Sequence, residues 1–230
     1  MSIDIKTIVM HCKSLSERKE SIVGQFEKNN FESYEFYTDY DAVELDQETI
    51  EKHYVSGHKD PVRWAQKLEV YPGAHSWHPM QCNGAEISLC MKYGKLFERL
   101  INEDFEYCII FEDDVLLCED FEDKLFEYLK ETPDDWDAIY FGSGANLKPD
   151  NVVPGKLAYL KSHPATKCTD SILMKKKTIM DLEKTFFPFN LTIDWELGYQ
   201  HSHHNHKIYW WEPSLVVQGS ESGRFKSTLR

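Results

Sequence analysis

The chain has 230 residues, of which 41% are hydrophobic and 13% are aromatic. This composition supplies enough apolar side chains for a sizeable core and excludes an intrinsically disordered protein. The formal net charge of −13 disfavours nucleic acid as a partner, because binding a phosphate backbone requires clustered Lys and Arg side chains. An acidic protein can still bind a nucleotide diphosphate when a divalent cation lies between the two negatively charged groups.

Cysteine usage and the N-terminal sequence indicate the compartment. The six cysteines show no CxxC spacing, which favours free thiols in a reducing environment. The first eleven residues lack the apolar segment of a signal peptide. No apolar run approaches the roughly 20 residues that span a bilayer. We therefore expect a cytoplasmic protein, either free or peripheral to a membrane, with no transmembrane segment.

The chain begins with a strand pattern followed by a helix pattern. Residues 5–11 (IKTIVMH) form a short apolar run that predicts a buried strand. Ser14 and Glu17 have the spacing of a capping box, and Ile22 and Phe26 then lie on one helical face. A helix starting near Ser14 is therefore expected after the first strand.

The next segment is less regular. Residues 34–38 (YEFYT) predict a second strand, and Asp46 is placed to cap a short helix that carries Ile50. Residues 70–83 are rich in Pro, Gly, His and Trp, which is typical of a long loop. Trp77 in this loop is the tryptophan best placed to stack on a sugar.

The middle of the chain has the clearest patterns. Residues 84–102 predict a helix, and residues 107–111 (YCIIF) are apolar throughout, as expected of a central strand. The triplet Glu112-Asp113-Asp114 follows this strand directly. A helix over 121–129 and a strand over 137–141 come next, and a Gly-Ser-Gly turn ends the strand.

The C-terminal third alternates in the same way. The patterns predict a strand at 171–174, a helix at 176–186, a short helix at 193–199, and strands at 207–211 and 215–217. Strands that alternate with helices indicate an α/β fold with a mostly parallel central sheet flanked by helices. Ligands bind such sheets beyond the carboxyl ends of the strands, so the acidic triplet is expected at the mouth of a site.

The triplet has two interpretations from the residues alone. Three adjacent carboxylates repel one another and lose solvation when partly buried, and a cation is the simplest way to hold them together. Mn²⁺ or Mg²⁺ accepts one or two carboxylates together with phosphate oxygens. The alternative is a solvated acidic turn between a strand and a helix.

The surroundings of the triplet carry a family resemblance. The helix opens with Gly84-Ala85-Glu86-Ile87, residues 109–121 read IIFEDDVLLCEDF, and residues 137–142 read DAIYFG. This order is similar to glycosyltransferase family 25, the lipooligosaccharide and collagen galactosyltransferases, which show GE(I/V)-x-C, then LEDDV, then D-x-V-Y-L-G. Weaker similarities extend over most of the chain and are found at residues 16–19 (SERK), 169–174 (TDSILM), 193–194 (ID) and 213–218 (PSLVVQ).

The resemblance implies a single GT-A-like nucleotide-diphospho-sugar transferase domain over 1–230. About 1–118 would form the donor nucleotide half and about 119–230 the acceptor side. The donor would be a UDP-sugar, with Mn²⁺ or Mg²⁺ as cofactor. Carried over by position, Asp114 would bind the metal and Glu112 would lie near the donor ribose, while Asp113 would be a second ligand or a helper. Arg18, in the segment that resembles the family's opening, is a further candidate for donor binding.

Two positions depart from the family pattern. Lys92 stands in a helix position where the family has Ser-His. It could supply a positive charge to the diphosphate, or it could be an exposed lysine on a helix. Asp170 replaces the His of the family's THAY segment, so any substrate contact made by that His is in doubt.

Four histidines, at positions 201, 203, 204 and 206, form the densest imidazole cluster. Many GT-A enzymes complete the metal site with one C-terminal His, and imidazole suits Mn²⁺. We take His204 as the candidate ligand, although the residues do not distinguish among the four. The alternative is an exposed His-rich loop.

Asp194 is the candidate catalytic base. Sugar transfer with inversion needs a base to take the proton of the acceptor hydroxyl. Asp194 lies between Ile193 and Trp195, an apolar setting that can raise its pKa. The alternative is an N-cap for the helix that follows.

Together these observations predict a metal-dependent glycosyltransferase. It would move a hexose such as galactose or glucose to a hydroxyl of a glycan, glycolipid or protein acceptor. One alternative is a metal-dependent phosphoesterase, because carboxylates and histidines also build two-metal sites. Another is a non-catalytic protein of the same fold that binds sugar or nucleotide.

Overall fold

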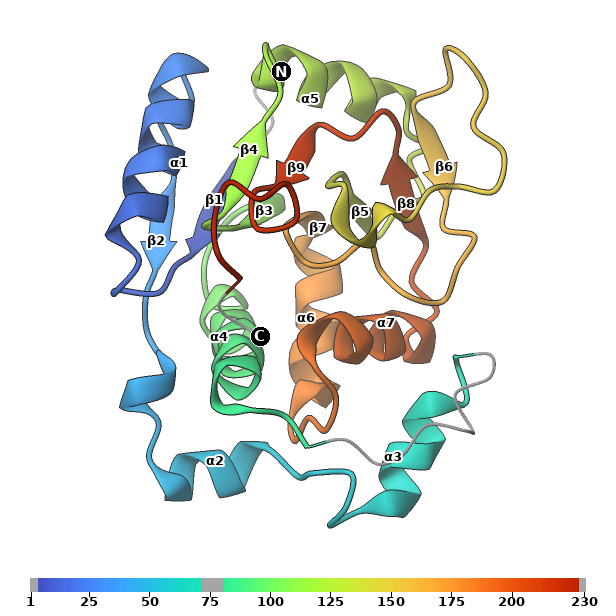
Figure 1. Cartoon of the computed structure of the whole chain (residues 1–230). Coiled ribbons are helices and arrows are strands. Elements are labelled where there is room, and N and C mark those ends of the chain that lie inside the picture. The colour runs from blue at the N-terminus through green and yellow to red at the C-terminus, as the bar shows by residue number, and fades with distance from the viewer. Residues whose placement is uncertain (1–3, 72–80, 228–230) are drawn as a thin grey trace.

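The computed structural model describes residues 4–71 and 81–227 (Figure 1). Most of the expected loop at 70–83, including Trp77, lies outside these residues. Among the residues described, no helix is both long enough and apolar enough to cross a membrane.

A seven-stranded sheet forms the centre of the molecule, in the order β2-β1-β3-β7-β5-β8-β6. The strands are β1 (Ile5–Met10), β2 (Glu35–Tyr37), β3 (Tyr107–Glu112), β5 (Ala138–Tyr140), β6 (Ala158–Leu160), β7 (Ser171–Lys175) and β8 (Ile208–Trp211). Strand β1 is parallel to β2 and β3, and β5 is parallel to β8. Strand β7 is antiparallel to both β3 and β5, and β6 is antiparallel to β8. Five strands therefore share one direction, and the expected α/β fold with a mostly parallel sheet is confirmed.

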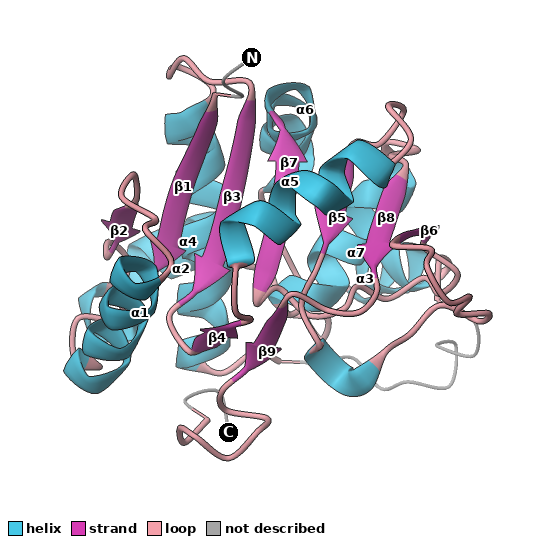
Figure 2. Ribbon diagram, turned by 90° about the horizontal axis from the view of Figure 1, so that it is seen from above, coloured by secondary structure: helices cyan, strands magenta, loops and turns pink. Residues whose placement is uncertain are grey.

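Helices cover both faces of the sheet (Figure 2). Helices α4 (Gly84–Leu100), α6 (Lys176–Phe186) and α7 (Ile193–His203) pack on one face, and α1 (Ser16–Lys28) and α5 (Phe121–Glu131) pack on the other. Strand β3 is apolar throughout because it contributes to both layers. Cys108 and Ile110 point to the α4 side, and Ile109 and Phe111 point to the α1 side.

Smaller elements complete the chain. These are the 3₁₀ segments η1 (Ala42–Glu44) and η3 (Gly144–Asn146), helices α2 (Gln47–His53) and α3 (Pro61–Leu68), and the antiparallel ribbon of β4 (Val115–Leu117) and β9 (Val216–Gln218). Helix α3 and strands β4 and β6 were not expected from the sequence. The ribbon lies next to the acidic triplet, so it brings the C-terminal part of the chain beside the end of β3.

The N-termini of two helices test the capping residues expected from the sequence: one expectation is confirmed and one is wrong. The side chain of Asp46 accepts a hydrogen bond from the Thr49 backbone N–H at 2.7 Å, so this expected N-cap is confirmed. Helix α1 begins at Ser16, with Leu15 as its N-cap and no side-chain cap. The capping box expected from Ser14 is therefore wrong, because the chain leaves β1 through a turn that includes Ser14.

The topology gathers several chain segments at one edge of the sheet. Strands β1 and β3 are neighbours and end at this edge, and β3 leads directly into the acidic triplet. Because β7 is antiparallel to β3, its first residues, and Thr169 and Asp170 before them, lie at the same edge. The site is therefore built from two strand ends and one strand beginning.

Candidate active site

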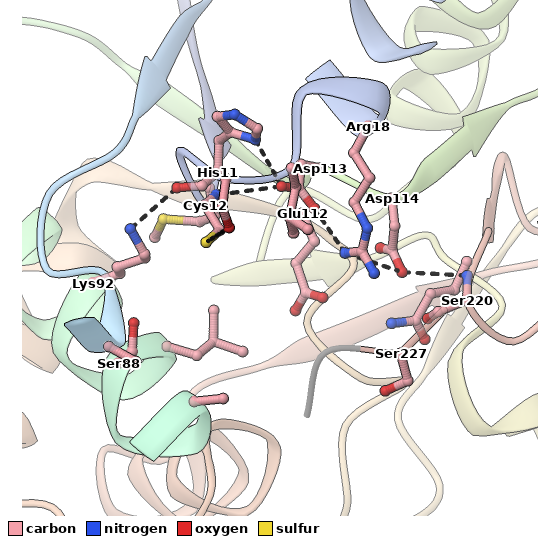
Figure 3. A pocket seen from close by; sticks show the side chains of 17 residues that line it. His11, Cys12, Arg18, Ser88, Lys92, Glu112, Asp113, Asp114, Ser220 and Ser227 are labelled. Atoms are coloured by element: carbon pink, nitrogen blue, oxygen red, sulfur yellow. Dashed lines mark hydrogen bonds and ion pairs between the residues drawn. The ribbon is translucent and has the colours of Figure 1, made fainter. Parts of the chain in front are cut away.

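A pocket of about 270 Å³ opens beside the triplet (Figure 3). Its walls come from the end of β1, the first turn of α1, one side of α4 and the segment after β9. Five of the residues expected at the donor site line it: Arg18, Lys92, Glu112, Asp113 and Asp114. Sequence positions almost a hundred residues apart thus meet in one cavity.

The C-terminal segment closes one wall of this pocket. The Gly219 backbone N–H donates to the Asp114 carbonyl at 2.7 Å. Arg18 Nη2 donates to the Lys226 carbonyl at 2.6 Å, and Ser220 lines the cavity. The segment after β9 is therefore fixed to both α1 and the triplet.

Asp113 is buried and fully bonded. Its Oδ2 accepts from His11 Nδ1 at 2.7 Å and from the Cys12 backbone N–H at 3.3 Å, and its Oδ1 accepts from Arg18 Nη1 at 2.9 Å. Both oxygens already have partners, as a buried charge requires. Asp113 was expected either to bind the metal or to support the other two carboxylates. Its hydrogen bonds fit the supporting role better, because they hold the turn in place.

Asp114 has a different environment. Its side chain is only 2% exposed, and Oδ2 accepts from the Ser220 backbone N–H at 3.3 Å and lies 3.9 Å from Arg18 Nη1. Its Oδ1 is buried and has no hydrogen-bond partner in the described part of the chain. A buried carboxylate oxygen without a partner is unfavourable, and a divalent cation would supply the missing interaction. The residue fits the metal role that the sequence predicts for it.

Glu112 points into the pocket from the end of β3 (Figure 3). Its Oε1 accepts from the Thr169 hydroxyl at 2.5 Å, and the Thr169 carbonyl accepts from the buried Tyr93 hydroxyl at 2.9 Å. Burial raises the pKa of Glu112 well above its usual range, and the charge of Asp114 adds to this effect. The charge of Asp114 thus disfavours the ionisation of Glu112, and a bound cation would reverse this effect.

Asp194 lies on the same network. Its Oδ1 is 3.4 Å from the Thr169 hydroxyl oxygen, which donates its single proton over the shorter contact to Glu112. The N-cap of α7 is Thr192, so the interpretation of Asp194 as the N-cap is wrong. Burial raises the pKa of Asp194 to about 6. A carboxyl with this pKa is ionised at neutral pH and is still basic enough to accept a proton.

Asp170 is a further acidic residue at the site. It is fully buried, and its Oδ1 accepts from the Ser171 hydroxyl at 3.0 Å. None of the described residues forms a hydrogen bond to its Oδ2. The Glu112 backbone N–H donates to the Asp170 carbonyl at 2.9 Å, which fixes this residue beside the triplet. Burial raises the pKa of Asp170 to about 8, and the charge of Asp114 contributes in the same direction.

Lys92 is buried, which corrects the interpretation of an exposed lysine on a helix. Its Nζ lies 2.8 Å from Asp41 Oδ1 and donates to the carbonyls of His11 and Asp39 at 3.1 and 2.7 Å. Its charge is therefore already balanced by Asp41. Lys92 fastens the end of β1 to the segment after β2, on the side of the pocket opposite Arg18 (Figure 3).

The structure does not bring His204 to the carboxylates. His204 follows the last residue of α7, whereas Asp194 lies in the first turn, and ten residues of helix separate them by about 15 Å. The His204 ring contacts the Thr185 hydroxyl at 2.8 Å and stacks on the ring of His206. His201 is buried in α7 and contacts the Tyr140 hydroxyl at 2.9 Å, so the expected exposed loop is also wrong for this residue.

The stability of the metal-free protein is expected to depend on the ionisation of Asp170. The folded-state pKa is raised, so this contribution to stability is complete below about pH 4 and is lost as the pH rises to about 8. The loss can approach about 1.4 kcal/mol per pH unit for one group. Chemical unfolding in EDTA at pH 5 and pH 8 tests this. The stability advantage of Asp170→Asn over wild type should be larger at pH 8, and equal differences at the two pH values would contradict it.

Comparison with solved structures returns distant likenesses. A197 from STIV has 10% identity and a TM-score of 0.45, with 93% of this chain and 83% of that chain covered. A glycosyltransferase involved in glycosylation of the PBCV-1 major capsid has 12% identity and a TM-score of 0.40, with 96% and 98% covered. The inositol-1-phosphate CTP transferase from T. maritima has 11% identity and a TM-score of 0.47, with 96% and 91% covered. Among curated protein sequences, none matches this chain.

The family comparison is more specific. The sequence profile of glycosyltransferase family 25, described as LPS biosynthesis protein, matches residues 4–204. The match includes β1, α1, α4, the acidic triplet, β7 and α7, and it ends before the segment after β9 that closes one wall of the pocket. The chain therefore belongs to glycosyltransferase family 25.

Proposed function

We propose that this protein is a metal-dependent glycosyltransferase that transfers a hexose from a UDP-sugar to an acceptor hydroxyl with inversion. The observation that carries the proposal is the unpartnered, buried Asp114 Oδ1 beside the pocket of a family 25 chain. Mn²⁺ or Mg²⁺ bound there would neutralise charge on the departing diphosphate.

The pocket offers distinct roles to its residues. We assign metal binding to Asp114 and contact with the donor ribose to Glu112. Arg18 keeps a positive charge beside the triplet while it holds Asp113 in place. Lys92 forms the opposite wall and positions the end of β1 through its hydrogen bond to the His11 carbonyl. We do not assign His204 to the metal site, because it follows the C-terminal end of α7 and lies away from the carboxylates.

Asp194 is the proposed base. The acceptor hydroxyl oxygen forms a bond to the anomeric carbon while the bond from that carbon to the diphosphate oxygen breaks. The hydroxyl proton passes to the Asp194 carboxylate, and UDP leaves with the electron pair of the broken bond. The Thr169 hydroxyl lies within 3.4 Å of Asp194 and within 2.5 Å of Glu112, so it connects the acceptor side to the donor side.

The phosphoesterase alternative requires a richer ligand set. Two-metal sites use several protein carboxylates and histidines at separations of a few ångströms. Within residues 4–71 and 81–227, no group of three His, Cys, Asp or Glu side chains is arranged to hold a metal. This favours a single cation that takes part of its coordination from the donor diphosphate, as Mg²⁺ often does.

The test is turnover of UDP-sugars, with UDP-galactose and UDP-glucose as the first donors. The wild type is expected to release UDP slowly in the presence of Mn²⁺, even without acceptor, and to stop when EDTA is added. Asp150→Asn is a matched control, because Asp150 is exposed and its change removes the same charge. Release of UMP and sugar 1-phosphate in place of UDP would indicate a phosphoesterase. Binding of UDP without any turnover across donors and acceptors would indicate the non-catalytic alternative.

A further inference from the structure

Two buried carboxylate oxygens near the pocket have no hydrogen-bond partner among residues 4–71 and 81–227. They are Oδ1 of Asp114, after β3, and Oδ2 of Asp170, before β7. Both side chains are at most 2% exposed, so bulk solvent does not reach these oxygens. Each residue bonds its other oxygen, to the Ser220 backbone N–H and to the Ser171 hydroxyl respectively. One oxygen of each carboxylate is thus left for a ligand.

The sheet holds Asp170 next to the triplet. Strand β7 pairs with β3 so that Phe111 faces Ser171, and the Glu112 backbone N–H continues this pairing to the Asp170 carbonyl at 2.9 Å. On its other side, β7 pairs with β5, which ends just before Gly142. The Asp170 carboxylate fills the space over Gly142, where an added Cβ would lie 1.9 Å from Oδ1. The absence of a side chain at position 142 therefore makes room for this buried acid.

The neighbouring cations do not neutralise both acids. Arg18 donates to Asp113 at 2.9 Å and lies farther, at 3.9 Å, from Asp114. Lys167 is directed to Glu212, with its Nζ 2.6 Å from Oε1. In the described part of the chain, no Lys, Arg or His forms an ion pair with Asp170. A pair of buried carboxylates with so little compensation is unfavourable unless a cation joins them.

We propose that Asp170 is a second protein ligand of the divalent cation and binds it together with Asp114. This inference rests on the proposed function and makes its metal site more specific. The cation would be held by one carboxylate after β3 and one before β7, and the donor diphosphate would supply further oxygens. Asp170 thus takes the part that the sequence suggested for His204, with a hard oxygen ligand in place of an imidazole.

The test is direct measurement of Mn²⁺ affinity, with UDP present, by calorimetry or by the loss of the free Mn²⁺ EPR signal. Asp170→Asn retains the size of the side chain and removes its charge. It should weaken Mn²⁺ binding by roughly tenfold or more. Melting of the metal-free variant at pH 8 should not fall, because the variant removes the cost of ionising a buried carboxyl group. Asp170→Ser is a second variant with the same expectation, and Asp150→Asn should bind Mn²⁺ like wild type.

The outcomes separate this inference from the proposed function. If wild type and Asp170→Asn bind Mn²⁺ equally well while Asp114→Ala does not, Asp170 is not a ligand and the proposed function stands. If wild type with UDP binds no Mn²⁺, both the ligand assignment and the metal requirement are contradicted. Weaker binding in both Asp170 variants, with normal binding in Asp150→Asn, supports the assignment.

Discussion

Asp114→Ala is expected to reduce glycosyl transfer by roughly 10²- to 10³-fold or more, with loss of Mn²⁺-dependent UDP binding. The reason is that Asp114 presents a buried oxygen at the pocket that has no hydrogen-bond partner among the described residues, and the proposal assigns this oxygen to the cation. Stability of the metal-free protein should be unchanged or slightly higher, since one of several mutually repelling carboxylates is removed. The measurement pairs UDP release under saturating donor with metal-free thermal melting.

Asp113→Ala is the matched control for this result. It removes the adjacent carboxylate, but Asp113 bonds His11, Cys12 and Arg18. Its loss removes the carboxylate that bonds the buried Arg18 guanidinium at 2.9 Å, so we expect a destabilisation of about 3–5 kcal/mol. Asp114→Ala should thus lose function with stability intact, whereas Asp113→Ala should lose stability. Full UDP affinity in Asp114→Ala would contradict the assignment of the metal site.

The second large effect is expected for Asp194→Asn. Loss of a positioned general base typically lowers the rate by about 10²- to 10⁴-fold, and transfer should fall by that factor. UDP binding and melting temperature should hardly change, because Asp194 contacts neither the pocket lining nor a metal ligand and Asn has nearly the same size. The deciding measurement is the transfer rate at saturating donor. A rate within a few-fold of wild type would show that the base lies elsewhere.

The pH profile gives an independent check on Asp194. Burial raises its pKa to about 6, so the carboxylate is protonated and inactive as a base below that pH. Wild-type transfer should therefore rise with pH through an apparent pKa near 6 and then level off. The residual activity of Asp194→Asn should lack this limb. If the transfer rate of the variant still rose with pH through about 6, the group that titrates there would not be Asp194.

Much of the sheet could be predicted because its strands are buried on both faces. Residues 107–111 are apolar at every position since alternate side chains enter the two core layers. Arg18 was suggested only by resemblance, yet it shares the buried face of α1 with Ile22 and Phe26, at intervals of four residues. That spacing is a signal that an arginine is turned inward. Helix α3 was also readable, since Asp60 caps it and Pro61 stands at its first position.

Other parts of the site depend on contacts that sequence patterns do not contain. Asp170 reaches the triplet because β7 is antiparallel to β3; a parallel strand would have placed its start at the opposite edge. The direction of a strand follows from the path of the connections before it, and the strand's own residues do not specify it. Lys92 is buried because Asp41, 51 positions earlier, neutralises it. His204 was suggested by the histidine cluster and by the C-terminal His that many GT-A enzymes use, and the added length of α7 places it away from the site.

The central claim is that a divalent cation joins the acidic pocket to a nucleotide diphosphate. The most direct measurement is wild-type melting with UDP, in the presence of Mn²⁺ and in the presence of EDTA. With Mn²⁺, UDP at about 100 times its dissociation constant should add roughly 2.7 kcal/mol to the unfolding free energy. With EDTA, UDP should produce no shift, because the bare diphosphate meets the negative charge of the triplet. An equal UDP-induced shift under both conditions would contradict the claim.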